Sequence, residues 1–73
     1  MDRKTLYYRG VIAHGGRLPD QATHRALGQA CGYTAHRDLA GFHGGREPSM
    51  VLMADGSRQL TAAGYRRARA LGC

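Results

Sequence analysis

Apolar residues recur at helical spacing along residues 3–14, and this pattern predicts a first helix. The positions that share one face of it are Leu6, Tyr7, Gly10, Val11 and His14. Gly15 and Gly16 end the helix, and Arg17 and Leu18 leave room only for a very short strand, because Pro19 cannot continue one. The chain is therefore expected to open with a helix and a short strand.

Residues 21–31 and 34–43 predict two further short helices on either side of a turn marked by glycine. Asp20 is a suitable N-cap for the first of them, and Gly32 ends it by accepting the left-handed backbone conformation. Thr34 is a suitable N-cap for the second. The expected buried positions are Ala26, Leu27, Ala30 and Cys31, followed by Leu39 and Phe42. Two short helices meeting across such a turn form a helix-turn-helix, which commonly presents a helix to the DNA major groove.

A hairpin and a final helix complete the pattern. Residues 49–54 are apolar and partly β-branched, Asp55-Gly56 predicts a tight turn with positive φ, and residues 57–60 form the return strand. Thr61 caps a helix over residues 62–71, with Gly64, Ala68 and Leu71 on one face. The expected fold is mainly α with a small β-hairpin, in a single domain over residues 1–73. Its order of helix, short strand, helix, helix, hairpin and helix is that of a winged helix-turn-helix, with the hairpin as the wing.

The composition favours a polyanionic partner. Eleven Lys and Arg residues against five Asp and Glu residues give a formal net charge of +6, and basic side chains displace condensed counterions from phosphates. Most of the basic residues are arginine, which forms bidentate bonds to phosphate and to guanine edges. A basic protein that is merely soluble is the alternative interpretation, and a GC-rich genome would produce the same arginine bias.

The chain shows no motif typical of an enzyme or a metal site. Its four histidines, two cysteines and five acidic residues lack a recognisable ligand spacing, and no nucleophile motif or nucleotide loop stands out. We therefore expect a binding module with no catalytic residues, metal or cofactor. The cysteines form no disulfide framework, and no apolar run has the length of a signal peptide or membrane span. The expected location is the cytoplasm, in association with the nucleoid, with no membrane partner.

The predicted recognition helix, residues 34–43, is expected to enter the major groove. Its contacts would come from Thr34, His36, Arg37, Ala40 and His43, the last four pointing outward or sideways. Arg37 is the expected base reader, because a guanidinium matches guanine O6 and N7, and a surface ion pair with Asp38 or Asp20 is the alternative. Thr34 and the first amides of the helix suit a phosphate.

The wing, residues 49–60, is expected to lie near the minor groove through Arg58, which follows the turn. Two further arginines, Arg17 and Arg46, end the two copies of a short repeat, His-Gly-Gly-Arg. Each copy is interpreted first as a helix C-cap and alternatively as a corner that faces a phosphate. The arginines of the last helix, Arg66, Arg67 and Arg69, either extend the phosphate contacts or form a solvated face.

The segment RQLTAAG at residues 58–64 resembles the R-x-L-T-x-x-G element of many bacterial winged-helix regulators, including the multiple-antibiotic-resistance and phenolic-acid regulator families. With ALGQACGY before it, the resemblance covers residues 20–71. It implies that Leu60 is a core residue, that Thr61 caps a helix and that Arg58 contacts DNA. Those regulators usually carry long additional helices, whereas this chain ends at Cys73, so the resemblance supports the fold type and no particular family.

The sequence thus predicts a small bacterial or phage transcriptional regulator that binds double-stranded DNA sequence-specifically, and a homodimer is kept as an open hypothesis. Because the sequence predicts no effector domain, its DNA binding would be regulated by the concentration of the protein, by its oligomerisation or by a partner. Two alternatives stay open at this stage: a winged-helix module for protein contact, and an RNA- or ribosome-binding protein that uses the same basic surface.

Overall fold

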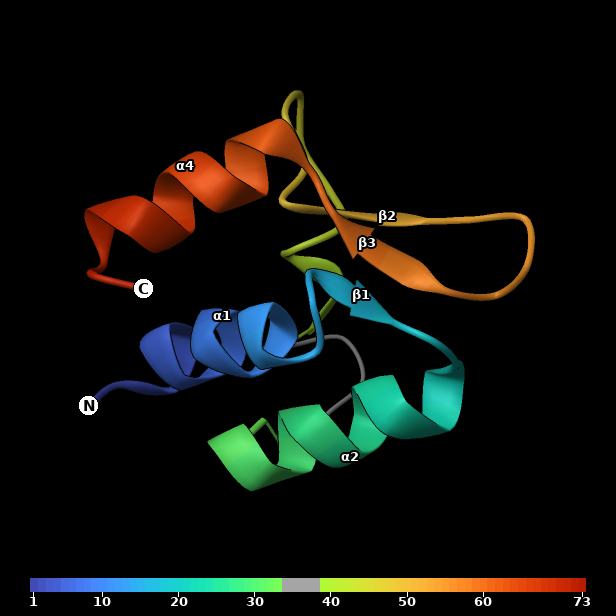
Figure 1. Ribbon diagram of the computed structural model, residues 1–73, viewed down its shortest axis with the longest axis horizontal. Coiled ribbons are helices and arrows are strands. Elements are labelled where there is room, and N and C mark those ends of the chain that lie inside the picture. The colour runs from blue at the N-terminus through green and yellow to red at the C-terminus, as the bar shows by residue number, and fades with distance from the viewer. Residues whose placement is uncertain (34–38) are drawn as a thin grey trace.

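The computed structural model describes residues 1–33 and 39–73 of the chain (Figure 1). Within them, three helices and three strands follow one another in the predicted order. They are α1 (Arg3–Ala13), β1 (Arg17–Leu18), α2 (Gln21–Cys31), β2 (Met50–Leu52), β3 (Arg58–Leu60) and α4 (Ala62–Ala70). The described part of the chain is mainly helical with a small antiparallel sheet, and at this level the predicted fold class is confirmed.

Local capping sets the helix boundaries. The Asp20 carboxylate accepts a hydrogen bond from Thr23 N (2.7 Å), and Thr61 Oγ1 accepts one from Gly64 N (3.0 Å). Gly32 ends α2 with a φ of 100°, a left-handed conformation that costs glycine little. These three predictions are confirmed.

The predicted helix 34–43 is described only at its end. Leu39 and Ala40 are helical, and residues 41–43 form a turn. Phe42 N donates to Leu39 O (3.1 Å) and His43 N donates to Ala40 O (3.0 Å), the i→i+3 bonds of a tight last turn. We call residues 39–43 the post-helix turn.

The three strands form one antiparallel sheet in the order β1-β3-β2. Leu18 and Leu52 both lie opposite Arg58, and Met50 lies opposite Leu60. Since residues directly opposite each other project to the same face of a sheet, these five side chains share one face. Leu18, Met50 and Leu60 are buried there against the helices. The other face carries Arg17, Val51 and Gln59, and it is turned away from the core.

The loop of the hairpin β2–β3 differs from the predicted two-residue turn. Met53 N donates to Ser57 O (2.8 Å) and Gly56 N donates to Met53 O (3.0 Å). The loop therefore has three residues, 54–56, and Gly56 alone has a positive φ, of 89°. This is a type I turn followed by a left-handed glycine, the usual three-residue connection. Asp55 keeps a negative φ, because its carboxylate bonds forward to Ser57 N (2.9 Å).

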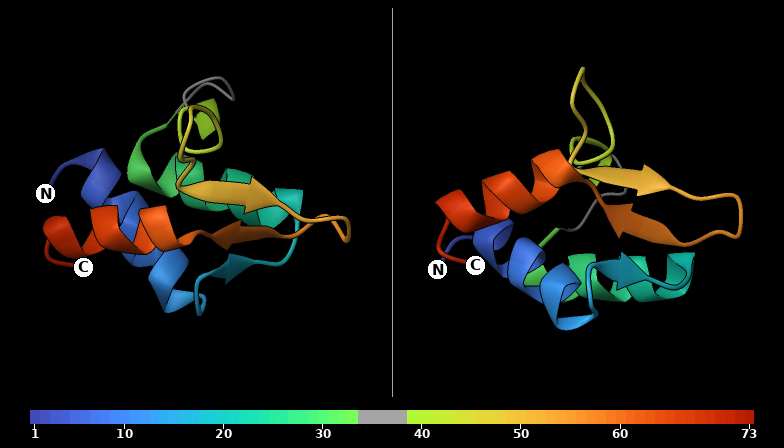
Figure 2. Two further views of the ribbon diagram at one scale, coloured as in Figure 1. Left: turned by 90° about the horizontal axis from the view of Figure 1, so that it is seen from above. Right: turned by 45° about the horizontal axis from the view of Figure 1, so that its top comes forward.

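Helices α1 and α4 lie side by side, and the hairpin extends away from them toward the other end of the molecule (Figure 2). Helix α2 packs against α1 and β1. Both termini lie at the helical end, where Cys73 Sγ donates to Thr5 O at 3.7 Å (Figure 1). Among the described residues, every helix is too short or too polar to cross a membrane.

The core is built around aromatic rings from α1 and the post-helix turn. Phe42 stacks on Tyr7 with ring centroids 4.1 Å apart, and the rings of Tyr8 and Tyr33 meet Phe42 edge-on. Tyr7, Tyr8 and Tyr33 are therefore core residues, and Tyr65, which is 37% exposed, lies at the edge of the core.

The buried faces of the helices differ from the predicted ones. Exposed positions include four that were expected to be apolar contacts: Leu6, Ala26, Ala30 and Leu71. Tyr8 and His24 are buried in their place. Each has a polar partner far away in the sequence, since Tyr8 Oη bonds Ser49 Oγ (2.8 Å) and His24 Nε2 bonds Tyr7 Oη (3.0 Å). Satisfied hydrogen bonds remove most of the cost of burying such groups.

Candidate nucleic-acid interface

The residues predicted to contact DNA do not lie on a single surface. Thr34, His36 and Arg37 fall outside the described residues. The other five lie at three different places in the fold: Ala40 and His43 in the post-helix turn with Arg58 beside them, Arg17 on the outer face of the sheet, and Arg46 in the loop before β2.

Arg58 lies beside the end of the predicted recognition helix. Together with Ala40 and His43 it lines a cavity of about 250 Å³ between the hairpin and the post-helix turn. Arg58 is half-buried, and its Nη1 donates to Gly56 O at 3.2 Å. Because Arg58 shares a sheet face with buried Leu60, its side chain lies on the side of the hairpin that faces the helices. Leu52, which is 58% exposed, lies at the same cavity.

Two histidine rings connect the post-helix turn to α2. His24 is 3% exposed, and its ring centroid lies 5.3 Å from that of His43 in an edge-on arrangement. His43 is half-buried, with its ring against that of buried His24. Burial raises the pKa of Tyr7, the phenol bonded to His24, so this hydroxyl stays neutral at physiological pH. The ring pair fixes where the post-helix turn lies on α2.

Arg17 projects from the opposite face of the sheet. It lies across from Gln59, the residue next to Arg58, and neighbouring residues of a strand point to opposite faces. Its guanidinium pairs with Asp55 at 3.0 Å, in a contact that is exposed on both sides. Arg17 and Arg58 therefore lie on opposite faces of the sheet and cannot both contact one flat partner. The ion pair of Arg17 with Asp55 connects the hairpin loop to β1.

The carboxylate of Asp55 is held in its charged form by the loop itself. Hydrogen bonds from Ser57 Oγ (2.6 Å) and Ser57 N (2.9 Å), followed by the Arg17 guanidinium, lower the pKa of Asp55 to about 2. Since the folded-state pKa lies below the usual 3.8, the stabilisation is complete above that value and is lost as the pH falls through about 2.

We expect Ser57→Ala to raise the pKa of Asp55 toward its usual value, because the hydroxyl bond is the largest single cause of the lowering, and Arg17→Gln, which removes a hydrogen bond and a charge, to raise it as well. An NMR titration of the Asp55 carboxyl carbon in the two variants measures both shifts. A larger rise in Arg17→Gln would show that the ion pair, and not the loop, holds the charge.

The His-Gly-Gly-Arg repeats show the geometry of helix caps. Nδ1 of His14 lies 3.0 Å from Gly10 O, and Nδ1 of His43 lies 3.4 Å from Leu39 O, so each ring contacts the carbonyl four residues earlier. Positive φ values follow at Gly15 and Gly16 in the first copy and at Gly45 in the second. Helix capping therefore accounts for both repeats.

Two of the three arginines of α4 tie this helix to the chain before β2. Arg66 pairs with the Glu47 carboxylate at 3.3 Å, and Arg67 Nη1 donates to Glu47 O (2.6 Å) and to Ser49 Oγ (2.8 Å). Arg69 is exposed. The basic cluster of the last helix is thus largely a structural connection.

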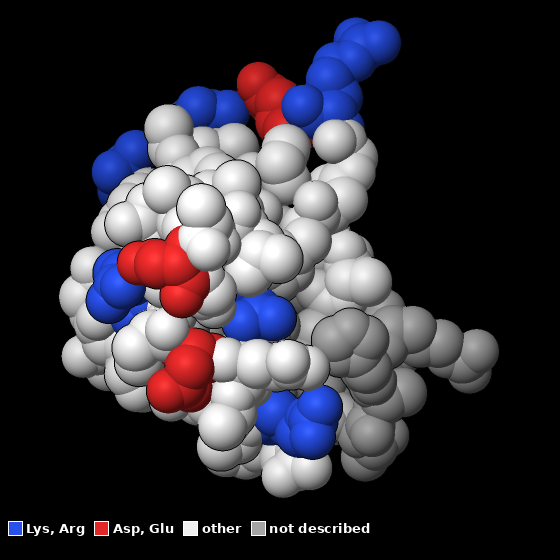
Figure 3. All heavy atoms as spheres, turned by 90° about the vertical axis from the view of Figure 1, so that its right-hand side faces the viewer, with Lys and Arg blue, Asp and Glu red and all other residues white. Residues whose placement is uncertain are grey.

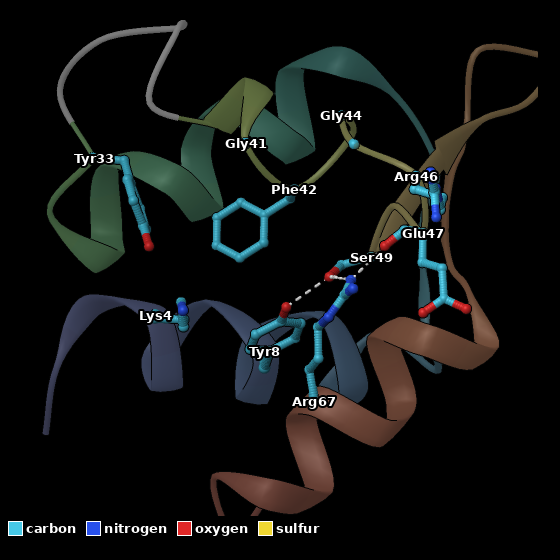
Figure 4. Close-up of a pocket in the computed structure, with 11 residues that line it drawn as sticks. Lys4, Tyr8, Tyr33, Gly41, Phe42, Gly44, Arg46, Glu47, Ser49 and Arg67 are labelled. Carbon is cyan, nitrogen blue, oxygen red and sulfur yellow. Dashed lines mark hydrogen bonds between the residues drawn. The ribbon is translucent and has the colours of Figure 1, made fainter.

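Arg46 lines a second, larger cavity of about 560 Å³ (Figure 4). Arg67, one of the arginines expected either to extend the phosphate contacts or to be solvated, lines it too, together with Lys4, Tyr8 and Ser49, which were not predicted to form a site. They come from α1, α4 and the loop before β2, so no local spacing in the sequence relates them.

Figure 3 shows the hairpin end of the molecule, where basic and acidic side chains are interspersed. Among the described residues on this view, the basic side chains form separate patches and not a continuous field. On this face the basic side chains therefore provide a general attraction for anions and not a directed stripe.

Comparison of the chain with protein-family models, curated proteins and solved structures gives no match. Within residues 1–33 and 39–73, no three His, Cys, Asp or Glu side chains lie close enough together to hold a metal ion. Arguments about function therefore rest on the geometry of this chain.

Proposed function

We propose that this protein binds double-stranded DNA as a small winged helix-turn-helix regulator of transcription. The observation that carries the proposal is the cavity that Arg58 shares with Ala40 and His43. It sets an arginine of the hairpin beside the end of segment 34–43, so that both can approach one duplex. A recognition segment in the major groove with a hairpin over the neighbouring groove is a recurrent way of reading DNA.

The roles divide between groove and backbone. Arg37 is proposed to read a guanine and Thr34 to hold a phosphate, with His36, Ala40 and His43 beside them. Arg58 is proposed to contact the minor groove, where the negative potential is strongest when the groove is narrow. Arg46 and Arg17 are left as contacts to more distant phosphates, because they lie away from this cavity.

The test is a titration of the protein with a duplex of randomised sequence, with single-stranded RNA and with heparin, each at several salt concentrations. We expect the duplex to bind most tightly and its affinity to fall with salt, with a log–log slope of about −0.9 for each phosphate contact. Absence of duplex binding at low salt would refute the proposal, and a preference for RNA would favour the RNA-binding alternative.

Arg58→Gln and Arg17→Gln form a matched pair, because each removes one positive charge from the sheet, on opposite faces. We expect Arg58→Gln to weaken duplex binding by about tenfold and to reduce the salt slope by about 1. The loss should be larger for sites with AT-rich flanks. Arg17→Gln should cost about threefold or less, since Arg17 is assigned only to a more distant phosphate. Fluorescence anisotropy measures both, and equal losses would show that the duplex does not distinguish the two faces.

Protein contact through the hairpin is a second candidate function, favoured by one observation. Val51, Leu52 and Met53 are consecutive and exposed by 41%, 58% and 39%. Apolar side chains grouped on a surface commonly mark interaction sites. If Leu52→Ser leaves duplex affinity unchanged but converts an oligomer to a monomer in sedimentation, the hairpin serves protein contact instead.

A further inference from the structure

The larger cavity, of about 560 Å³, has the size of a small-molecule site. It lies between α1, the end of α2, the loop before β2 and α4 (Figure 4), and Arg46 is the one residue of its lining that the DNA-binding proposal also uses, as a contact to a more distant phosphate. Three cationic side chains line it: Lys4, Arg46 and Arg67. Glu47 is the acidic residue of the lining, and its carboxylate is directed toward α4, where it pairs with Arg66 (Figure 4).

Arg67 is held in place by the protein before any ligand arrives. One of its terminal nitrogens, Nη1, donates to both Glu47 O and Ser49 Oγ, and Ser49 Oγ in turn bonds Tyr8 Oη. A guanidinium has five N–H donors in a fixed plane, so the bonds to Nη1 orient the group and leave its other donors for an anion. An oriented group loses little conformational entropy when it binds.

Arg46 and Lys4 add two positive charges to the lining of the cavity. Neither side chain forms an ion pair or a hydrogen bond within residues 1–33 and 39–73. Arg46 precedes Glu47, whose carbonyl holds Arg67, so the two arginines come from neighbouring parts of the cavity wall. Gly44 and Gly45 line the same region, where the chain has no side chains to fill the space. Arginines are suited to the planar, bidentate recognition of phosphate.

The opposite end of the cavity is aromatic. Tyr33 and Phe42 line it, and Lys4 lies below Tyr33 in Figure 4. Both rings are fixed by the core, since they meet each other edge-on with centroids 5.8 Å apart. A planar ring can pack on such a wall.

We propose that this cavity binds a small phosphorylated molecule with a planar ring, of the mononucleotide class. The phosphate lies between Arg46 and Arg67, and the ring lies at the end lined by Tyr33 and Phe42. Because Gly41 and Phe42 belong to the post-helix turn, the ligand would touch the segment that follows residues 34–38. The proposal does not depend on DNA binding.

Adenosine 5′-monophosphate, inorganic phosphate and adenosine are the probes, each titrated calorimetrically into the full chain. We expect the monophosphate to bind at least about tenfold more tightly than either fragment, because only it reaches both ends of the cavity. Equal affinity for the monophosphate and inorganic phosphate would overturn the assignment of a ring site. Failure of the monophosphate to bind would overturn the proposal as a whole.

Arg46→Gln and Lys4→Gln test the lining, with Arg25→Gln, an exposed arginine of α2 outside the cavity, as the matched control. We expect monophosphate affinity to fall by about tenfold and threefold in the first two and to stay unchanged in the third. Equal losses in all three would show attraction by net charge alone. Displacement of the bound monophosphate by duplex DNA would assign the cavity to the nucleic-acid surface and refute a separate ligand.

Discussion

Phe42→Ala is expected to lower the free energy of unfolding by about 3–5 kcal/mol, the usual cost of removing a buried aromatic ring. Phe42 is 6% exposed and touches the rings of three tyrosines, and its stack on Tyr7 is the closest of these contacts. The ring also joins the post-helix turn to α1. Its removal should therefore loosen the turn as well as open a cavity.

A domain of this size rarely has more than about 5 kcal/mol of stability, so Phe42→Ala should be largely unfolded at room temperature. Phe42→Leu, which keeps much of the volume, is expected to cost about 1.5 kcal/mol and to remain measurable. Circular dichroism without denaturant shows whether Phe42→Ala is folded, and urea denaturation followed by circular dichroism gives the cost of Phe42→Leu. Leu71→Ala, at a position that is 38% exposed, is the control and should cost under about 1 kcal/mol. A stable Phe42→Ala protein would contradict the placement of this ring in the core.

Gly64→Ala is expected to destabilise the fold by about 3 kcal/mol. A Cβ at Gly64 would collide with Ser49 O and would lie 2.7 Å from Leu60 Cδ1. Backbone cannot move aside as a flexible side chain can, so α4 would have to shift away from the sheet, which is the strain that overpacked sites show. The shift would also stretch the bond from Thr61 N to Ser49 O, now 2.9 Å.

Gly44→Ala provides the matched control for Gly64→Ala. Gly44 is exposed, and a Cβ there would lie 3.5 Å from Ala40 O, an ordinary contact. Thermal unfolding of the two variants should show a clear drop in melting temperature for Gly64→Ala and a change within about 0.5 kcal/mol for Gly44→Ala. Similar melting temperatures for both would contradict the close approach of α4 to the loop before β2.

The order and the ends of the helices were predictable because local residues decide them. Asp20, Gly32 and Thr61 act on backbone groups within three residues, and each does so as its type predicts. Which face of a helix is buried depends on partners elsewhere in the chain. His24 was missed for this reason, since its bond to Tyr7 spans a long stretch of sequence.

In the candidate sites, too, features set by local residues were predictable and features set by distant partners were not. The hairpin could be predicted from Asp55-Gly56, but its loop length could not, because the dipeptide fits a two- or a three-residue loop equally well. The separation of Arg17 from Arg58 depends on the register of β1 against β3, in which Arg17 lies opposite Gln59. A shift by one residue would exchange the faces, and a two-residue strand carries too little pattern to fix the register in advance.

The two chain ends lie close together, and this determines where the protein can be labelled or joined to another copy. Cys73 reaches back to Thr5, and both ends lie away from the hairpin (Figure 1). Neighbouring termini favour the insertion and joining of domains. A fluorescent reporter attached at either end should therefore leave the hairpin accessible, and a flexible linker from the last residue of one copy to the first of the next should give a single-chain tandem whose two hairpins are free to move independently.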